Sequence, residues 1–358
     1  MAGNAPKVSI LLPSLNARKF LESRVDSLLK QTFVDWEAIV LDSESTDGTW
    51  EFFNSVAQTD SRLRLYQIPR EGLYAALNRG LDLAAGEFLY IAPCDDTMAP
   101  EFLSELLEAL GRWPDVGVAV CDCLFINPDG RELIAQDMTG QLSRRSIKSL
   151  LRSASVRTSI PAMRQRNVNY RPPPHDCLLH FTGRSVYFSL TQLLVRTAVA
   201  KATGPFETTV GSVADFGWLV RLTSLTASVH IPKRLATWRF HGEQLSVQRD
   251  DTRLSTMSKM CEAILPEIRQ RYPRLLTQSD CKLLLLPYKA LLAKSAIQRV
   301  SCWIEALAGL CRMFVARPLA TLRALCRTGF RAGIGRNFLV AIIFQRERLL
   351  PRDLKSLG

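Results

Sequence analysis

Acidic side chains occur at two points where apolar, strand-like runs of the sequence end. Asp42 follows the run 36–41, and the adjacent pair Asp95 and Asp96 follows the run 88–92. Adjacent carboxylates can hold a hard divalent cation such as Mg²⁺ or Mn²⁺, while phosphate oxygens of a substrate complete its coordination. Such a pair, taken alone, is more often a helix cap and its neighbour. The placement of both acidic points at strand ends favours a site for a metal ion and a diphosphate.

These residues are positioned by predicted strands that alternate with helices. We expect strands at 8–12, 36–41, 63–68, 88–92 and 116–121, and helices at 17–31, after residue 47, at 73–85 and at 100–110. This alternation indicates βαβ units and a parallel sheet. Ligands of such sheets bind beyond the carboxyl ends of the strands. The sequence therefore predicts an α/β fold whose site lies at one edge of the sheet.

Two common phosphate-binding motifs are missing from the chain. No G-x-G-x-x-G follows the first strand, and no Walker A lysine motif occurs. Their absence argues against a nicotinamide enzyme and a P-loop enzyme. A nucleotidyltransferase would also use paired carboxylates and a metal, but would usually show a Gly-rich phosphate loop after the first strand.

Several motifs, in their order and spacing, resemble the family 2 glycosyltransferases. The donor-side motifs are Lys7–Asn16 (KVSILLPSLN), Gln31–Phe33 (QTF), Asp42–Thr49 (DSESTDGT), Gly72–Gly80 (GLYAALNRG) and the pair Asp95-Asp96. The acceptor-side motifs are Gly204–Phe206 (GPF), Ala214–Arg221 (ADFGWLVR) and Trp238–His241 (WRFH). Each motif is weak alone, but their combination is specific.

The resemblance implies a glycosyltransferase-A fold, which is a Rossmann-like, mostly parallel sheet flanked by helices, here with a C-terminal helical extension. It implies an inverting, hexosyltransferase-like enzyme that uses a nucleotide-sugar donor and Mg²⁺ or Mn²⁺, as in cell-surface polysaccharide synthesis. The acceptor would be a hydroxyl of a glycan or of a polyprenyl-diphosphate-linked sugar. A non-catalytic nucleotide-sugar or glycan-binding protein on the same fold is the alternative.

The resemblance also assigns roles to site residues. Donor binding falls to Pro13, Asn16, Asp42, Asn78 and Asp95, metal binding to Asp96 and His241, and general-base catalysis to Asp215. Many members carry a second Asp after the position of Asp42, where this chain has Ser43. Many also carry Glu before the position of Asp215, where this chain has Ala214.

Four of these assignments have a structural alternative. Asn78 either hydrogen-bonds the donor or caps a turn, and His241 either approaches the metal or packs in the interior. Asp215 is either the base or a helix cap. Asp96 is expected to face solvent at the end of its strand, as the better metal ligand of the pair.

The net charge of +12 is concentrated in two segments. Residues 138–175 carry eight basic and no acidic side chains, and residues 299–358 carry eleven basic and three acidic ones among apolar residues. Such a mixture suits amphipathic helices on an anionic membrane surface. A helical appendage packed on the catalytic domain is the alternative. No motif of a nucleic-acid reader is present, so nucleic acid is not an expected partner.

The pattern predicts a donor half at 1–125, an acceptor half at 126–251 and a basic helical extension at 252–358. No apolar stretch reaches the roughly 18 residues that span a bilayer. The nine cysteines form no recognisable disulfide framework. We therefore expect a cytoplasmic protein, either free or peripheral on the inner face of the cytoplasmic membrane.

Overall fold

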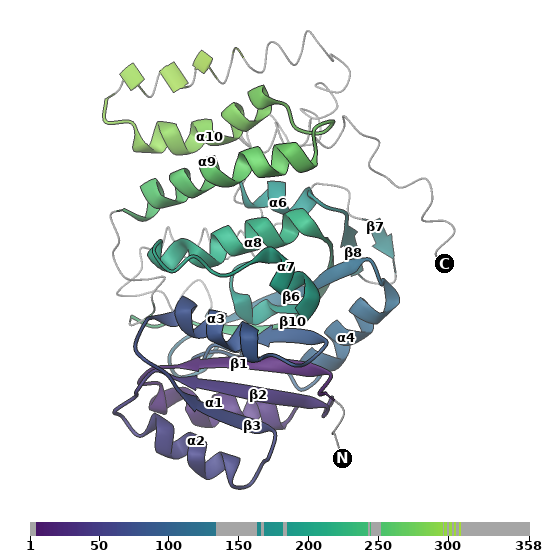
Figure 1. Cartoon of the computed structure of the whole chain (residues 1–358), viewed down its shortest axis with the longest axis vertical. Coiled ribbons are helices and arrows are strands. Elements are labelled where there is room, and N and C mark those ends of the chain that lie inside the picture. Colours follow the sequence, from purple (N-terminus) through teal and green to yellow (C-terminus); the bar gives the residue numbers. More distant parts are fainter. Residues whose placement is uncertain are drawn as a thin grey trace. The chain divides into compact units, whose positions relative to one another are not determined.

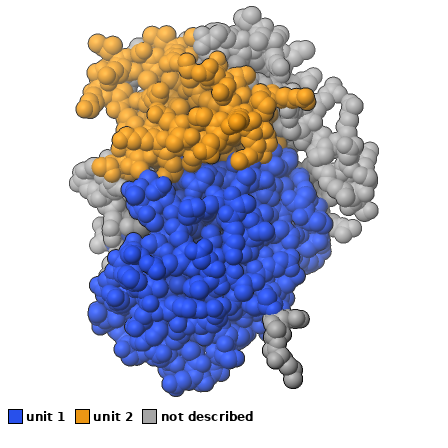
Figure 2. All heavy atoms as spheres, viewed as in Figure 1, with its two compact units in different colours: residues 1–156, 162–173, 186–249 blue, residues 157–161, 174–185, 250–358 orange. Residues whose placement is uncertain are grey.

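The computed structural model describes residues 5–133, 163–165, 168–181, 185–242, 244 and 252–295, with isolated positions between 297 and 308. Most of the basic segment 138–175 and the predicted amphipathic stretch beyond 308 lie outside these residues. Contacts divide the chain into two compact units (Figure 2). Unit 1 comprises 1–156, 162–173 and 186–249, and unit 2 comprises 157–161, 174–185 and 250–358.

Unit 1 contains a ten-stranded sheet within the described residues (Figure 1). Its strands are β1 (Val8–Ser14), β2 (Trp36–Asp42), β3 (Leu63–Gln67), β4 (Phe88–Ile91), β5 (Thr97–Met98), β6 (Val116–Ile126), β7 (Met163–Gln165), β8 (Val168–Arg171), β9 (Leu193–Arg196) and β10 (Ala227–Arg239). They are ordered β3-β2-β1-β4-β9-β6-β10-β8-β7, and β5 pairs with β10. The five strands expected from the sequence are therefore confirmed, and the fold is α/β.

The strand order reverses beside β1. β2 and β3 extend the sheet in parallel on one side of β1, and β4 pairs in parallel on the other. β9 lies antiparallel between β4 and β6, whereas β6 and β10 run parallel to each other. β1 to β4, β6 and β10 thus end at the same edge, with the switch in strand order at β1, where such sheets bind ligands.

Helices cover both faces of this sheet. One core is formed with α1 (Arg18–Leu29), α2 (Thr49–Ala57) and α4 (Phe102–Arg112), and the other with α3 (Leu73–Leu83), α7 (Thr197–Thr203) and α8 (Ala214–Leu225). Alternate residues of β1 serve the two cores, because side chains of a strand alternate between its faces: Ile10 and Leu12 join the first core, and Leu11 joins the second. α3 approaches the sheet closely at Gly80, where an added Cβ would lie 2.7 Å from Leu41 Cδ1.

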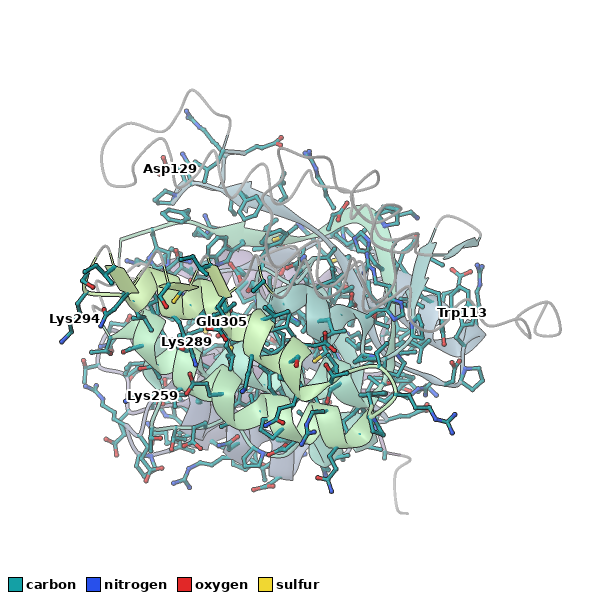
Figure 3. All side chains as sticks on the ribbon, turned by 90° about the horizontal axis from the view of Figure 1, so that it is seen from above. Trp113, Asp129, Lys259, Lys289, Lys294 and Glu305 are labelled. Atoms are coloured by element: carbon teal, nitrogen blue, oxygen red, sulfur yellow. The ribbon has the colours of Figure 1, made fainter. Side chains whose placement is uncertain are left out.

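Unit 2 is helical in its described part, with α6 (His175–His180), α9 (Arg253–Arg271) and α10 (Gln278–Leu292). α10 starts with a capping box, in which Thr277 and Asp280 bond each other's backbone N–H groups. Lys259 and Lys289 lie exposed on these helices (Figure 3). Among the described helices, none combines the length and the apolar character that crossing a membrane requires.

Candidate active site

Asp42 holds together the loops that follow β1 and β2. Its Oδ1 accepts hydrogen bonds from the hydroxyls of Ser14 (3.1 Å) and Ser45 (2.6 Å), and its Oδ2 accepts one from the Ser45 N–H (3.0 Å). The residue is 0% exposed. Pro13, one position before Ser14, is also buried in β1. Asp42 and Pro13, two predicted donor-binding residues, are therefore buried, and they support the loops from inside the protein.

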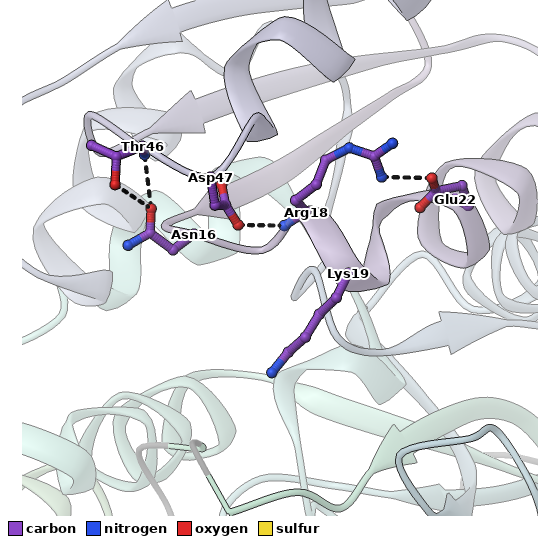
Figure 4. A pocket seen from close by; sticks show the side chains of 6 residues that line it. All are labelled: Asn16, Arg18, Lys19, Glu22, Thr46 and Asp47. Atoms are coloured by element: carbon purple, nitrogen blue, oxygen red, sulfur yellow. Dashed lines mark hydrogen bonds and ion pairs between the residues drawn. The ribbon is translucent and has the colours of Figure 1, made fainter.

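A hollow of 740 Å³ lies above these loops and is lined by polar side chains (Figure 4). Asn16, in the left-handed region at φ 49°, accepts the Thr46 N–H at 2.9 Å. Asp47 accepts the N–H groups of Arg18 (2.9 Å) and Thr49 (3.1 Å). Burial opposes ionisation of Asp47, but hydrogen bonds from Thr49 and Arg18 outweigh it and lower the pKa of this carboxyl. Both loops are thus fixed before any ligand binds.

Asp95 and His241 form a pair at the same edge of the sheet. Asp95 lies between β4 and β5, His241 follows β10, and His241 Nε2 lies 2.9 Å from Asp95 Oδ2. The side chains are 24% and 12% exposed, respectively. His241 Nδ1 is buried and has no hydrogen-bond partner among the described residues. The ring of Phe20 lies 4.9 Å from that of His241.

Asp96 has a different environment from its neighbour. It is 1% exposed, and its Oδ1 accepts the Arg239 N–H at 2.9 Å, which anchors the end of β10. Burial and the adjacent charge of Asp95 raise the pKa of Asp96 well above its ordinary value. The expectation that Asp96 faces solvent is wrong, because its carboxylate is buried and accepts a hydrogen bond from a backbone N–H of β10.

A divalent cation fits Asp95 and His241 better than Asp96. Hard cations are commonly bound by one or two protein ligands when substrate phosphates complete the coordination. Asp95 and His241 present one carboxylate oxygen and one ring nitrogen to each other at hydrogen-bond distance, so both could face one ion. In the described part of the chain, no group of three or more potential ligands occurs. A metal held here therefore depends on further ligands from a substrate.

Asp215 lies in the first turn of α8 and is half-buried. Its Oδ1 accepts the Phe216 N–H at 2.6 Å. α8 ends just before β10, whose first residue pairs with Val116 at the start of β6. α8 thus runs back against the strand direction, which puts its first turn toward the edge where the strands end. The N-terminus of a helix also stabilises a negative charge.

Asn78 does not present its amide to a ligand. Its Nδ2 donates to the Phe206 carbonyl (2.9 Å), and its Oδ1 accepts the Phe206 N–H (2.8 Å). Both ends of the amide are thus used by one residue that is 128 positions away. This geometry favours the structural alternative for Asn78, in which its amide bonds backbone groups, over donor binding.

Sequence reasoning missed the role of Arg239. Its backbone N–H bonds Asp96, and its Nε donates to the Asp95 carbonyl at 2.8 Å. Its guanidinium also donates to the carbonyls of Asn127 and Pro128. The residue lies between Trp238 and His241 in a recognised motif, but no local pattern signals contacts to backbone groups more than 100 positions away.

Comparisons with known proteins show which family and fold the chain resembles. Residues 9–173 match the model of the family "Glycosyl transferase family 2". A PGL/p-HBAD biosynthesis glycosyltransferase of Mycobacterium tuberculosis is 38% identical over 145 residues, which are 40% of this chain and 57% of that protein. The chondroitin synthase of Pasteurella multocida is 30% identical over 125 residues, which are 35% of this chain and 13% of that protein. The chain thus spans little more than half of the first relative's length.

A solved structure extends the likeness of the fold to most of the chain. The crystal structure of S. aureus TarS 1–349 in complex with UDP-GlcNAc matches with a TM-score of 0.55 at 17% sequence identity. The match covers 95% of this chain and 91% of that one. At this identity the likeness shows a shared fold.

Proposed function

We propose that the chain, whose residues 9–173 match the model of glycosyl transferase family 2, is an inverting, metal-dependent glycosyltransferase of that family with a glycosyltransferase-A fold. It moves a sugar from a nucleotide-sugar donor to a hydroxyl of a glycan or of a lipid-linked sugar. The observation that carries the proposal is the pair Asp95 and His241, held at the edge of the sheet toward which α8 carries Asp215.

The donor's diphosphate belongs beside Asp95 and His241. When bound, Mg²⁺ or Mn²⁺ would neutralise the charge that develops on the leaving nucleoside diphosphate. Asp95 and His241 would hold the ion. Asp96 supports their positions, because its bond to the Arg239 N–H fixes the end of β10. Asp42 and Asn16 support the nucleoside side in the same way, since their bonds fix the loops after β1 and β2.

Asp215 acts as the general base. A sugar hydroxyl is a poor nucleophile until a carboxylate accepts its proton. With the base on the face of the sugar opposite the leaving diphosphate, the anomeric centre inverts in one displacement, as in the two-sided geometry of inverting glycosidases. Asp215 is the acidic residue of the first turn of α8, since the preceding position, where many members carry Glu, is Ala214.

The names of similar proteins support a surface glycan or glycolipid as the product. The mycobacterial relative is a PGL/p-HBAD biosynthesis glycosyltransferase, and the solved structure contains UDP-GlcNAc. A polyprenyl-diphosphate-linked acceptor would lie at a membrane surface, and the eleven basic residues within 299–358 suit peripheral binding on the anionic inner face of that membrane.

Turnover and binding of sugar nucleotides by the variant Asp215→Asn test the proposal. We expect wild-type protein, with Mn²⁺, to hydrolyse one sugar nucleotide of a panel of UDP-, GDP- and dTDP-sugars or to transfer its sugar. Asp215→Asn should lower kcat by roughly 10²- to 10⁴-fold, the usual contribution of a positioned base, with donor affinity unchanged. Glu207→Gln, an exposed acid in the preceding loop, is the matched control and should leave kcat unchanged.

Two outcomes would contradict the proposal. Wild-type protein that binds a sugar nucleotide with Mn²⁺ but turns over none would favour the non-catalytic alternative. Loss of donor affinity rather than kcat in Asp215→Asn would give this carboxylate a structural role.

A further inference from the structure

The segment 203–206, which begins at the last residue of α7 and leads into the loop before α8, is held by side chains at each of its residues. Its four consecutive carbonyl groups each accept a hydrogen bond from a side chain. Arg221 donates to the first and third (3.3 and 2.6 Å), and Trp218 donates to the second (3.0 Å). Asn78 donates to the fourth (2.9 Å) and also accepts the N–H of the same residue. The segment is therefore bonded to α8 on one side and to α3 on the other.

Aromatic packing joins the same elements. The ring of Phe206 lies between Tyr74 of α3, at 5.7 Å and 27°, and Trp218 of α8, at 4.6 Å and 20°. Phe206 is 3% exposed and Trp218 is 0% exposed. Offset stacks of this kind resist sliding, and buried cores leave no free volume for a shift. α3 and α8 are thus connected through Phe206 by both packing and hydrogen bonds.

This connection ends one helical turn from the proposed base. Trp218 and Asp215 are three residues apart in α8, and such residues share one face of a helix. A shift of Trp218 therefore shifts Asp215. At the other end, α3 packs directly on β1 and β2, the strands whose loops Asp42 ties together. The distance of the base from the donor loops is fixed along this path.

We propose that Asn78 is a positioning residue that sets the location of Asp215 relative to the donor loops, acting through 203–206 and Trp218. The proposal rests on the proposed function, because it takes Asp215 as the base. An asparagine suits this position because one amide both donates and accepts, which matches the N–H and carbonyl of a single residue. A misplacement of about 1 Å can lower an enzyme's rate about 10²-fold.

The test compares Asn78→Ala with Ser9→Ala. Ser9 is a matched control because its buried hydroxyl also serves two backbone groups, the N–H groups of Ala85 and Gly86, but at the opposite edge of the sheet. The measurements are kcat and KM for hydrolysis of the sugar nucleotide that wild-type protein turns over, calorimetric donor affinity with Mn²⁺, and hydrogen exchange of residues 203–216.

We expect Asn78→Ala to lower kcat about 10- to 100-fold while donor affinity changes less than threefold, as for a base out of position. Exchange should rise across 203–216. Asn78→Asp, which cannot donate to the Phe206 carbonyl, should be no better, whereas Ser9→Ala should keep wild-type kcat and exchange in this region.

Each other result overturns the inference. A loss of donor affinity with kcat retained would return Asn78 to donor binding. Equal effects of Asn78→Ala and Ser9→Ala on kcat would reduce Asn78 to general stability. Unchanged exchange at 203–216 would remove the connection itself, and this readout needs no turnover. Failure of the proposed function is distinguishable, because it shows as wild-type protein that turns over no sugar nucleotide, or as Asp215→Asn that loses donor affinity rather than kcat.

Discussion

Separate asparagine substitutions of Asp95 and Asp96 distinguish a ligand of the proposed metal ion from a residue that anchors the fold. Each change replaces a carboxyl oxygen by an amide nitrogen and alters almost no volume. Asp95→Asn removes the charge of a carboxylate that faces His241 and is 24% exposed. Asp96→Asn alters a side chain that is 1% exposed and bonded to the Arg239 N–H. The two neighbours should therefore give opposite results.

The environment of Asp96 sets the expected change in stability. The Oδ1 of an asparagine can still accept the Arg239 N–H, so that hydrogen bond survives. Burial and the charge of Asp95 raise the pKa of Asp96, so the native state binds a proton more tightly than the unfolded state does. The free energy of unfolding therefore falls as pH rises from about 4 toward that raised pKa. Asp96→Asn should remove this dependence and leave the protein at least as stable at pH 7.

Asp96→Ala provides the internal calibration. It leaves the Arg239 N–H without its partner in a buried position, which typically costs about 1–3 kcal/mol. Asp95→Asn should leave stability nearly unchanged, since the carboxylate is partly exposed. Its loss should appear in donor turnover instead, by about 10²- to 10³-fold, the effect of removing one group that stabilises the charge of a transition state.

The assay combines calorimetric titration of UDP and GDP, with and without Mn²⁺, with unfolding measured from pH 4 to 8. We expect Asp95→Asn to abolish the Mn²⁺-dependent part of binding and Asp96→Asn to retain it within about threefold. The reasoning is refuted if Asp96→Asn loses Mn²⁺-dependent binding while folded and Asp95→Asn keeps it. That result would restore the assignment that the sequence alone favours.

Two further predictions concern the nucleotide and unit 2. Ser43→Asp should raise the preference for UDP over GDP, because a carboxylate gives a charge-assisted contact that Ser43 cannot, and equal ratios of the two Kd values in both proteins would exclude Ser43 from base selection. Burial lowers the pKa of His180 to about 4, so the native state stays neutral where the unfolded state takes up a proton. The free energy of unfolding should then fall by up to about 3 kcal/mol as pH drops from 6.5 to about 4. His180→Leu should flatten that fall, and an unchanged pH profile of unfolding would contradict the prediction.

Five strands of unit 1, β1 to β4 and β6, could be predicted because buried parallel strands are mostly apolar runs. β1 and β2 are buried at each position, and such short, mostly apolar sequences are typical of buried parallel strands. Since the residues after such strands meet at one edge, the sequence also predicted that the acidic residues at the ends of β2 and β4 lie at that edge. The position of β9, inserted antiparallel between β4 and β6, did not follow, because pairing partners that are distant in sequence leave no local periodicity.

The different burial of Asp95 and Asp96 could not be predicted from the sequence, for a related reason. β5, which follows them directly, pairs with β10 at Thr237, about 140 positions later. That pairing, together with the Arg239 N–H bond, turns Asp96 inward and leaves Asp95 near the surface. Asn78 presented the same difficulty, because both partners of its amide belong to Phe206. A side chain's neighbours along the chain do not specify a partner that arrives through tertiary structure.

Burial separates the predicted site residues into two groups with different consequences for mutation. Asp42 and Asp96 are almost fully buried, and the carboxylate of each accepts hydrogen bonds that hold a loop or a strand end in place. Asp95, His241 and Asp215 retain exposed surface at the edge where the strands end. Removing a hydrogen-bond acceptor of the first group leaves buried donors unpaired and lowers stability. Removing a group of the second kind should lower the rate of sugar transfer in a protein that is still folded, so stability and turnover measured together assign each residue to its group.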